Sequence, residues 1–134
     1  MRKALNGEPL IIAGDGSQFR KFIYVEDLAE GNVMALKSVA KNKIYNLDGK
    51  DRITIKQIAE TIKKLLGNIK IEYTSERPGD FSGKDVSSEL AKRELGWKPN
   101  ISFEEGVRRY IAWYQEQEGK RKADWEKIDK TLRS

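Results

Sequence analysis

Residues 14–27 decide the fold and read Gly14-Asp15-Gly16-Ser17-Gln18-Phe19-Arg20-Lys21-Phe22-Ile23-Tyr24-Val25-Glu26-Asp27. The glycines at the start predict a tight turn after a short apolar strand at residues 10–13. The β-branched and aromatic residues 22–25 predict a second strand. The two acidic residues that follow favour the first turn of a helix over about residues 26–39, because negative charge there complements the helix dipole. Arg20 therefore lies between a flexible turn and a predicted strand.

A second loop, Arg77-Pro78-Gly79-Asp80, completes a pattern with the first. Each is a glycine-containing turn with one arginine, and arginine presents a planar fork suited to bidentate contact with phosphate. One interpretation is that Arg20 and Arg77 hold a diphosphate together without a metal, while Asp80 accepts a hydrogen bond from a ribose hydroxyl. The other interpretation is that both segments are surface turns whose arginines are solvated.

The glycine pattern superficially resembles a dinucleotide-binding turn. We reject that interpretation because Phe19 stands at the third glycine position. The residues that follow predict a strand, so no helix N-terminus would face a phosphate. We therefore expect this chain to bind no cofactor.

The rest of the chain predicts short strands among helices. Thr54 and Gln57 form a capping box, which predicts a helix that Gly67 ends. The pattern is typical of a mixed α/β (α+β) fold with few short strands, about four to five helices and no complete Rossmann domain. Because so few short strands make a poor independent sheet, we expect some to pair with another body of protein. The other expected elements are the end of a helix closed by Gly7, strands at 43–47 and 69–73, and helices at 87–95 and from 102 onward.

Composition restricts the classes of function. The chain has 134 residues, a length typical of one domain, and a net charge of +5. It contains no Cys and no His, so we expect no disulfide and no metal site. No apolar run is long enough for a membrane span and no secretory signal is present, so we expect a cytoplasmic protein and no membrane partner. A basic surface favours phosphorylated ligands, but no nucleic-acid-binding motif accompanies the charge, so we expect no nucleic-acid partner.

Several motifs in order resemble the C-terminal half of NAD-dependent nucleotide-sugar epimerases and dehydratases. These are extended short-chain dehydrogenase/reductases, of which UDP-glucose 4-epimerase is the best-known member. The resemblance implies a small substrate-binding domain at residues 1–118 that binds a UDP-sugar, followed by a charged tail or helix at 119–134. The motifs are those at 9–29, Tyr45-Asn46-Leu47, Thr54-Ile55, Arg77-Pro78-Gly79-Asp80, Asp85-Val86-Ser87, residues 94–99 and Glu104-Glu105-Gly106.

The resemblance also implies roles for individual residues. Arg20 and Arg77 would grip the diphosphate, and Asp80 would hold the ribose. The base and sugar pocket would be lined by Ile11, Ala13, Phe22 and Ile55, for which ordinary core packing is the alternative. Two positions depart from the family pattern: Lys21 stands where Asp is usual, and Ala13 stands where a larger, often aromatic, residue is common.

The catalytic elements of the family are absent from the sequence. No tyrosine is followed four residues later by lysine, and no glycine-rich turn for NAD is present, so we expect no catalytic residue. The resemblance implies that NAD acts in the intact enzyme and that this chain is a fragment, a split gene product or a truncated form. Its partner would be a separate cofactor-binding half or a homodimer mate. The alternative is a stand-alone protein-interaction module that keeps the fold without catalysis and uses its strands and the helix at 26–39 as an interface.

Overall fold

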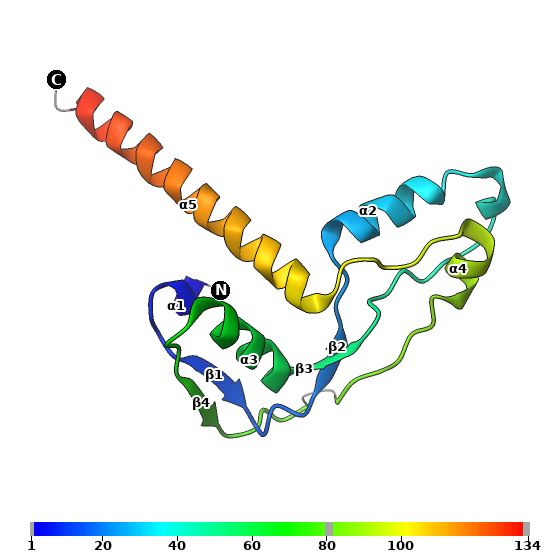
Figure 1. The fold of residues 1–134 in the computed structure, drawn as a ribbon, viewed down its shortest axis with the longest axis horizontal. Coiled ribbons are helices and arrows are strands. Elements are labelled where there is room, and N and C mark those ends of the chain that lie inside the picture. The colour runs from blue at the N-terminus through cyan, green and yellow to red at the C-terminus, as the bar shows by residue number, and fades with distance from the viewer. Residues whose placement is uncertain (1, 80–81, 133–134) are drawn as a thin grey trace.

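The computed structural model describes the backbone of residues 2–79 and 82–132, with side chains as far as Arg121 (Figure 1). Within that part of the chain, the expected mixed α/β fold with few short strands and five helices is confirmed. None of the described helices combines the length and apolar character that crossing a bilayer requires. The elements in chain order are α1 (Arg2–Leu5), β1 (Leu10–Ala13), β2 (Phe19–Lys21), α2 (Val25–Met34), the 3-10 helix η1 (Ser38–Ala40), β3 (Arg52–Thr54), α3 (Ile55–Leu66), β4 (Ile71–Thr74), α4 (Glu89–Leu95) and α5 (Phe103–Leu132).

Two separate ribbons replace a single sheet. Strands β1 and β4 pair in parallel, with Ile12 opposite Tyr73, and β2 and β3 pair antiparallel, with Arg20 opposite Ile53. Figure 1 shows α1 and α3 beside the β1–β4 ribbon, α2 and α4 at the other end of the molecule, and β2–β3 between them. The C-terminal half of α5 projects away from the rest of the chain (Figure 1).

Each end of the molecule has its own small core. Near the β1–β4 ribbon, the buried side chains of Ala4, Ile62 and Ile69 pack together, and Leu10 and Val107 pack against them. This core forms because the apolar residues of α3 recur at helical spacing and cover one face of the ribbon.

The second core lies between α2 and α4. Trp97, only 1% exposed, packs with Ala91 and Leu95, while Leu47 packs against this cluster. Gly31 allows close packing there, because a Cβ at that position would lie 2.5 Å from Leu47 Cδ1.

Local sequence signals define several element ends correctly. The capping box at the start of α3 is confirmed: the Gln57 amide donates to Thr54 Oγ1 at 3.0 Å, and the Thr54 amide donates to Gln57 Oε1 at 2.8 Å. Gly67 follows α3 and Gly96 follows α4, both with φ near +75° (76° and 75°). Such positive φ values cost glycine little and other residues more, which explains why both helices stop where predicted.

The strand predicted at residues 22–25 is wrong, because β2 occupies Phe19–Lys21 instead. The aromatic side chains of the predicted strand pack elsewhere. The Phe22 ring lies 5.2 Å from the Phe103 ring at the start of α5, and Tyr24 lies against Gly106. Tertiary packing has therefore overridden strand propensity in this segment.

Two further predictions need correction, one of a strand and one of the end of a helix. Residues 43–47 form no strand, and their Lys43 and Tyr45 side chains bind Glu94 instead of aligning with a neighbouring strand. Helix α2 ends at Met34 rather than near Val39, and η1 follows it. The backbone of residues 119–132, predicted to be a tail or a helix, continues α5 without a break.

Candidate functional site

Residues 14–20, which run from a turn into β2, contact the chain that follows β4 at both Thr74 and Ser82. The Gly14 amide donates to the Thr74 carbonyl oxygen at 3.0 Å, and the Phe19 amide donates to the Ser82 carbonyl oxygen at 2.9 Å. Gly83 lies directly on the Phe19 ring, because a Cβ there would come within 2.5 Å of a ring carbon. Arg20 itself lies in β2, so the structure brings this strand and the turn before it against the two ends of the loop that carries Arg77.

The first loop also covers the start of α3. The amides of Ile55 and Lys56 donate to the carbonyl oxygens of Gln18 and Gly16 at 2.9 and 3.0 Å. These are the N–H groups that a helix N-terminus would offer to a phosphate, and here the loop already binds them. Gly16, with φ +73°, fits closely against α3, since a Cβ would lie 2.9 Å from Ile12 Cγ2 and 3.1 Å from the Lys56 nitrogen.

Arg20 extends from the middle of β2 into an open hollow of about 550 Å³. One of its guanidinium nitrogens, Nη1, donates to the Phe19 carbonyl oxygen at 2.7 Å. The hollow is lined on other sides by Asn32, Tyr45 and Lys84. Its lining also includes Lys21 and one carboxylate, Asp48, so cationic groups outnumber acidic ones, which favours an anionic ligand.

Arg77 is exposed in the loop that follows β4, and it does not line the hollow that Arg20 enters. The structure therefore places the two predicted arginines on adjacent loops without assigning them to one cavity. Asp80, the predicted ribose-binding residue, lies outside the described residues.

The four residues predicted to line the base and sugar pocket divide into two groups. Ile11, 55% exposed, and Ala13 lie on the face of β1 opposite the buried Ile12, and Ile55 is half-buried at the start of α3. Phe22 instead lines an apolar cavity of about 490 Å³ between residues 22–25, α3 and α5, and the other three do not line it.

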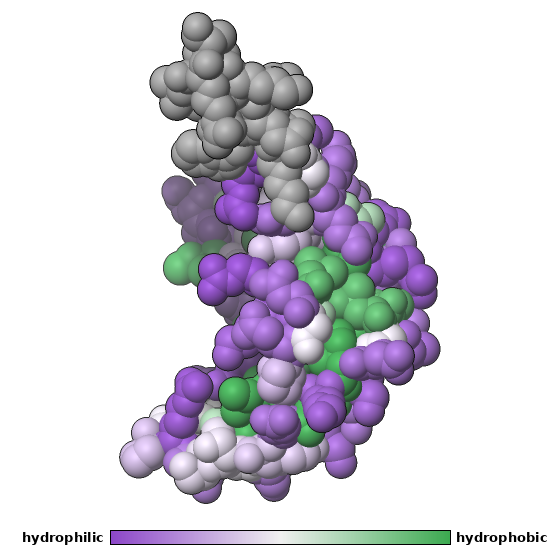
Figure 2. Space-filling view, turned by 90° about the vertical axis from the view of Figure 1, so that its left-hand side faces the viewer, coloured by the Kyte–Doolittle hydropathy of each residue, from purple (hydrophilic) through white to green (hydrophobic). Residues whose placement is uncertain are grey.

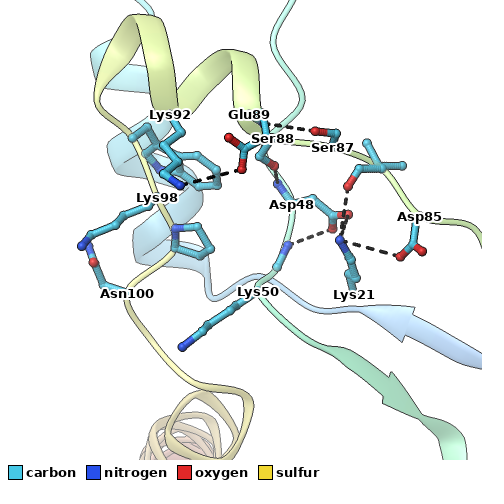
Figure 3. A pocket seen from close by; sticks show the side chains of 14 residues that line it. Lys21, Asp48, Lys50, Asp85, Ser87, Ser88, Glu89, Lys92, Lys98 and Asn100 are labelled. Carbon is cyan, nitrogen blue, oxygen red and sulfur yellow. Dashed lines mark hydrogen bonds and ion pairs between the residues drawn. The ribbon is translucent and has the colours of Figure 1, made fainter.

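Sequence reasoning missed a charged cluster, defined as Lys21, Asp48, Arg52 and Asp85. Three of its members, Lys21, Asp48 and Asp85, line a larger cavity of about 730 Å³ (Figure 3). The Lys21 ammonium lies 3.8 Å from Asp85 Oδ1 and 4.0 Å from Asp48 Oδ2. Arg52 Nε donates to Asp85 Oδ1 at 2.9 Å, and a second guanidinium nitrogen binds Oδ2. The signal available in the sequence was Lys21 itself, at a position where the family pattern has an acidic residue.

A second polar group borders the Arg20 hollow. Glu94 Oε2 accepts hydrogen bonds from Lys43 Nζ and from the Tyr45 hydroxyl, both at 2.7 Å. The hydrogen bond from Lys43, with that from Tyr45, holds the pKa of the Glu94 carboxyl below its ordinary value. Desolvation, with the hydrogen bond to Glu94, raises the pKa of the Tyr45 hydroxyl. At neutral pH Glu94 is therefore ionised and Tyr45 is neutral.

Comparison with known proteins gives a consistent result. Residues 1–110 match the model of the GDP-mannose 4,6 dehydratase family. A UDP-glucuronate 4-epimerase from Thermodesulfobacterium geofontis is 37% identical over 110 residues, which are 81% of this chain and 34% of the relative. A dTDP-glucose 4,6-dehydratase from Salmonella typhimurium is 35% identical over 120 residues, covering 83% of this chain and 33% of the relative.

Solved structures agree with the sequence relatives. A UDP-glucose 4-epimerase from Thermotoga maritima, solved with UDP-glucose, matches 86% of this chain and 37% of its own, with a TM-score of 0.77 and 28% identity. A dTDP-glucose 4,6-dehydratase from Bacillus anthracis, solved with NAD, matches 88% of this chain and 38% of its own, with a TM-score of 0.78 and 30% identity. The chain thus spans about a third of the length of the relatives it matches.

Proposed function

The chain belongs to the GDP-mannose 4,6-dehydratase family, and from this premise we propose that it is the nucleotide-sugar-binding part of an NAD-dependent epimerase or dehydratase. The resemblance that the sequence motifs indicated is thereby confirmed at the level of the family. The observation that carries the proposal is the side-by-side packing of the two arginine loops, held at Gly14–Thr74 and Phe19–Ser82.

The ligand in this proposal is a UDP-sugar, and the reaction of the intact enzyme is that of a UDP-glucose 4-epimerase. Arg20 and Arg77 bind the diphosphate from adjacent loops, each guanidinium donating two hydrogen bonds to phosphate oxygens. Asp80 accepts a hydrogen bond from the ribose. The base and sugar contact Ile11, Ala13, Phe22 and Ile55.

Chemistry on the sugar belongs, in this proposal, to a part of the enzyme that this chain does not contain. The residues present do not fit the pyrophosphate of NAD, because the first amides of α3 are bound by the carbonyl oxygens of Gly16 and Gln18. Phe19 also occupies the place where a dinucleotide-binding turn has its third glycine. The contribution of this chain is therefore to bind and orient the substrate.

The partner in this proposal is the cofactor-binding part of the enzyme, which packs on the apolar side chains left uncovered here. Several lie on or near α2: Val33 is 67%, Leu36 86% and Ile44 88% exposed. Figure 2 views the molecule from the side of α1 and β4, away from α2, and shows further apolar side chains gathered in the middle of that face, with hydrophilic residues around them. Apolar surface of this extent marks an interaction site.

The same exposed residues on and near α2 favour a second candidate, a stand-alone interaction module that forms a homodimer. Light scattering separates the two candidates. A stable dimer that Leu36→Glu converts to a monomer would favour the module, whereas a monomer at high concentration would favour the substrate-binding part of a larger enzyme.

Titration calorimetry with UDP-glucose tests the proposed function. We expect the 134-residue chain to bind weakly or undetectably, because part of the pocket comes from elsewhere. Tight binding abolished by Arg20→Ala or Arg77→Ala would support the arginine pair and refute the need for a second part. Arg121→Ala is the matched control, since Arg121 pairs with Glu118 on α5. Turnover of UDP-glucose with added NAD would contradict the absence of catalytic residues.

A further inference from the structure

Two cations face each other across the β2–β3 ribbon. Lys21 of β2 is the register partner of Arg52 in β3, so both side chains lie on the same face. Like charges directly opposite each other destabilise a strand pair. Asp85 removes the conflict, because its carboxylate binds Arg52 through both oxygens and lies 3.8 Å from the Lys21 ammonium.

The carboxylate comes from the segment at residues 82–86, which follows the Arg77 loop. This segment contacts the ribbon at four successive points. The Phe19 amide binds the Ser82 carbonyl oxygen, Gly83 lies on the Phe19 ring, Asp85 binds the two cations, and Lys21 Nζ donates to the Val86 carbonyl oxygen at 3.2 Å. Figure 3 shows Lys21 between Asp48 and Asp85, with dashed lines to both.

The cluster differs from an ordinary surface ion pair in its number of partners, and it is partly buried. The Lys21 and Asp48 side chains are 19% and 18% exposed, whereas those of Asp85 and Arg52 are 42% and 61% exposed. The Arg52 guanidinium also lies 5.1 Å from the centre of the Phe19 ring. Charges that share several partners in a half-buried site fix geometry more firmly than an isolated exposed pair.

Alternation along β2 places Phe19 and Lys21 on one face and Arg20 on the other. The 82–86 segment contacts the Phe19 and Lys21 side of the ribbon, and its Lys84 and Val86 also line the hollow that Arg20 enters. The Arg77 loop is held at both ends, at Thr74 by Gly14 and at Ser82 by Phe19. Its far end continues into the segment that carries Asp85 of the charged cluster.

We propose that Lys21 and Asp85 are positioning residues, which fix the Arg77 loop against the strand that carries Arg20 and so set the separation of the two guanidinium groups. The effect of this positioning on ligand binding rests on the proposed function, whereas its effect on the position of the loop does not. The alternative is that the cluster contributes only to the stability of the fold. In that case, loss of the charged cluster would lower the melting temperature and leave the position of the Arg77 loop unchanged.

Spin labels test the positional part without a ligand. The natural chain has no cysteine, so Ser82→Cys and Ala29→Cys introduce two unique sites for pulsed electron-electron distance measurement. We expect one narrow distribution in the parent, a broader one with Lys21→Met or Asp85→Asn, and recovery of the narrow one with Lys21→Arg. Lys92→Met is the matched control, because Lys92 lines the same cavity and lies 3.8 Å from Glu89 within α4.

Titration with UDP and with uridine tests the functional part. Lys21→Met should weaken UDP binding about threefold to tenfold and leave uridine binding unchanged, because only UDP carries the diphosphate. If Lys21→Met fails to fold, Asp85→Asn gives the same test. Unchanged distance distributions in both variants would overturn the inference, whether or not the parent binds UDP. Broadened distributions with an unchanged affinity for UDP would retain the positioning role and reject its consequence for ligand binding.

Discussion

The indole nitrogen of Trp97 donates a 2.8 Å hydrogen bond to the backbone carbonyl oxygen of Asp27. The Asp27 carboxylate in turn accepts from the Ile101 amide at 2.9 Å. Both side chains are buried, so the first turn of α2 and the chain between α4 and α5 are joined in a dry environment. The two hydrogen bonds therefore hold the start of α2 against the chain that leads into α5.

Trp97→Phe tests the first of these hydrogen bonds. The variant keeps most of the apolar volume but leaves the Asp27 carbonyl without its donor. We expect the free energy of unfolding to fall by about 1–3 kcal/mol, measured by urea denaturation. Trp97→Ala, which also leaves a cavity, should cost about 3–5 kcal/mol. A Trp97→Phe variant as stable as the parent would show that the hydrogen bond contributes nothing.

Glycine-to-alanine changes in two helices form a matched pair. A Cβ at Gly31 in α2 would lie 2.5 Å from Leu47 Cδ1 and 3.0 Å from Trp97 Nε1, whereas a Cβ at Gly119 in α5 meets nothing within 4 Å. Gly31→Ala should therefore destabilise by about 1–3 kcal/mol through overpacking. Gly119→Ala should be neutral or raise helix content, because alanine has the better helix propensity. Thermal melts followed by circular dichroism measure both, and a tolerated Gly31→Ala would contradict the packing at the second core.

The capping box at α3 gives a third prediction. Thr54→Ala removes the acceptor of the Gln57 amide and should lower stability by about 1 kcal/mol. Thr54→Ser keeps an oxygen in that place and should restore most of the loss. Because β3 ends at Thr54, amide exchange should also rise in the β2–β3 ribbon of the alanine variant. A serine variant as unstable as the alanine variant would indicate that the methyl group, and not the cap, matters.

Glu94 makes stability depend on pH in the acidic range. Its pKa is lowered in the folded chain by Lys43 and Tyr45, so the stabilisation is complete above the ordinary pKa of 4.5. It is lost progressively as pH falls from there through the lowered folded-state pKa. Glu94→Gln should flatten this part of the curve of unfolding free energy against pH. Glu89→Gln, at an exposed site on the same helix, serves as control.

The sequence predicted the elements whose ends carry local signals. Thr54 with Gln57, and Gly67 and Gly96, mark their helix boundaries through short-range chemistry, so those boundaries were correct. The β2–β3 ribbon was missed because strands of three residues are determined by their distant partner rather than by propensity. Residues 22–25 looked like a strand, but their aromatic rings pack on the start of α5.

The candidate site was likewise predicted from the sequence only in part. The two arginine loops were recognised from turn residues and motif order, and the structure brings the loops together. The charged cluster was missed, because Lys21 and Asp85 are 64 positions apart in sequence (85 − 21) and no local pattern links them. Long-range ion pairs of this kind follow from the fold and have no periodic signature.

The most direct test of the account is an NMR titration that follows the Nε–Hε signals of Arg20 and Arg77 with UDP, and with uridine as control. NMR detects binding in the millimolar range, which suits a pocket that is only partly present in this chain. The account predicts that UDP shifts both signals together with one affinity, while uridine leaves both unchanged. UDP shifting neither arginine, or only one of them, at saturation would contradict a shared diphosphate site.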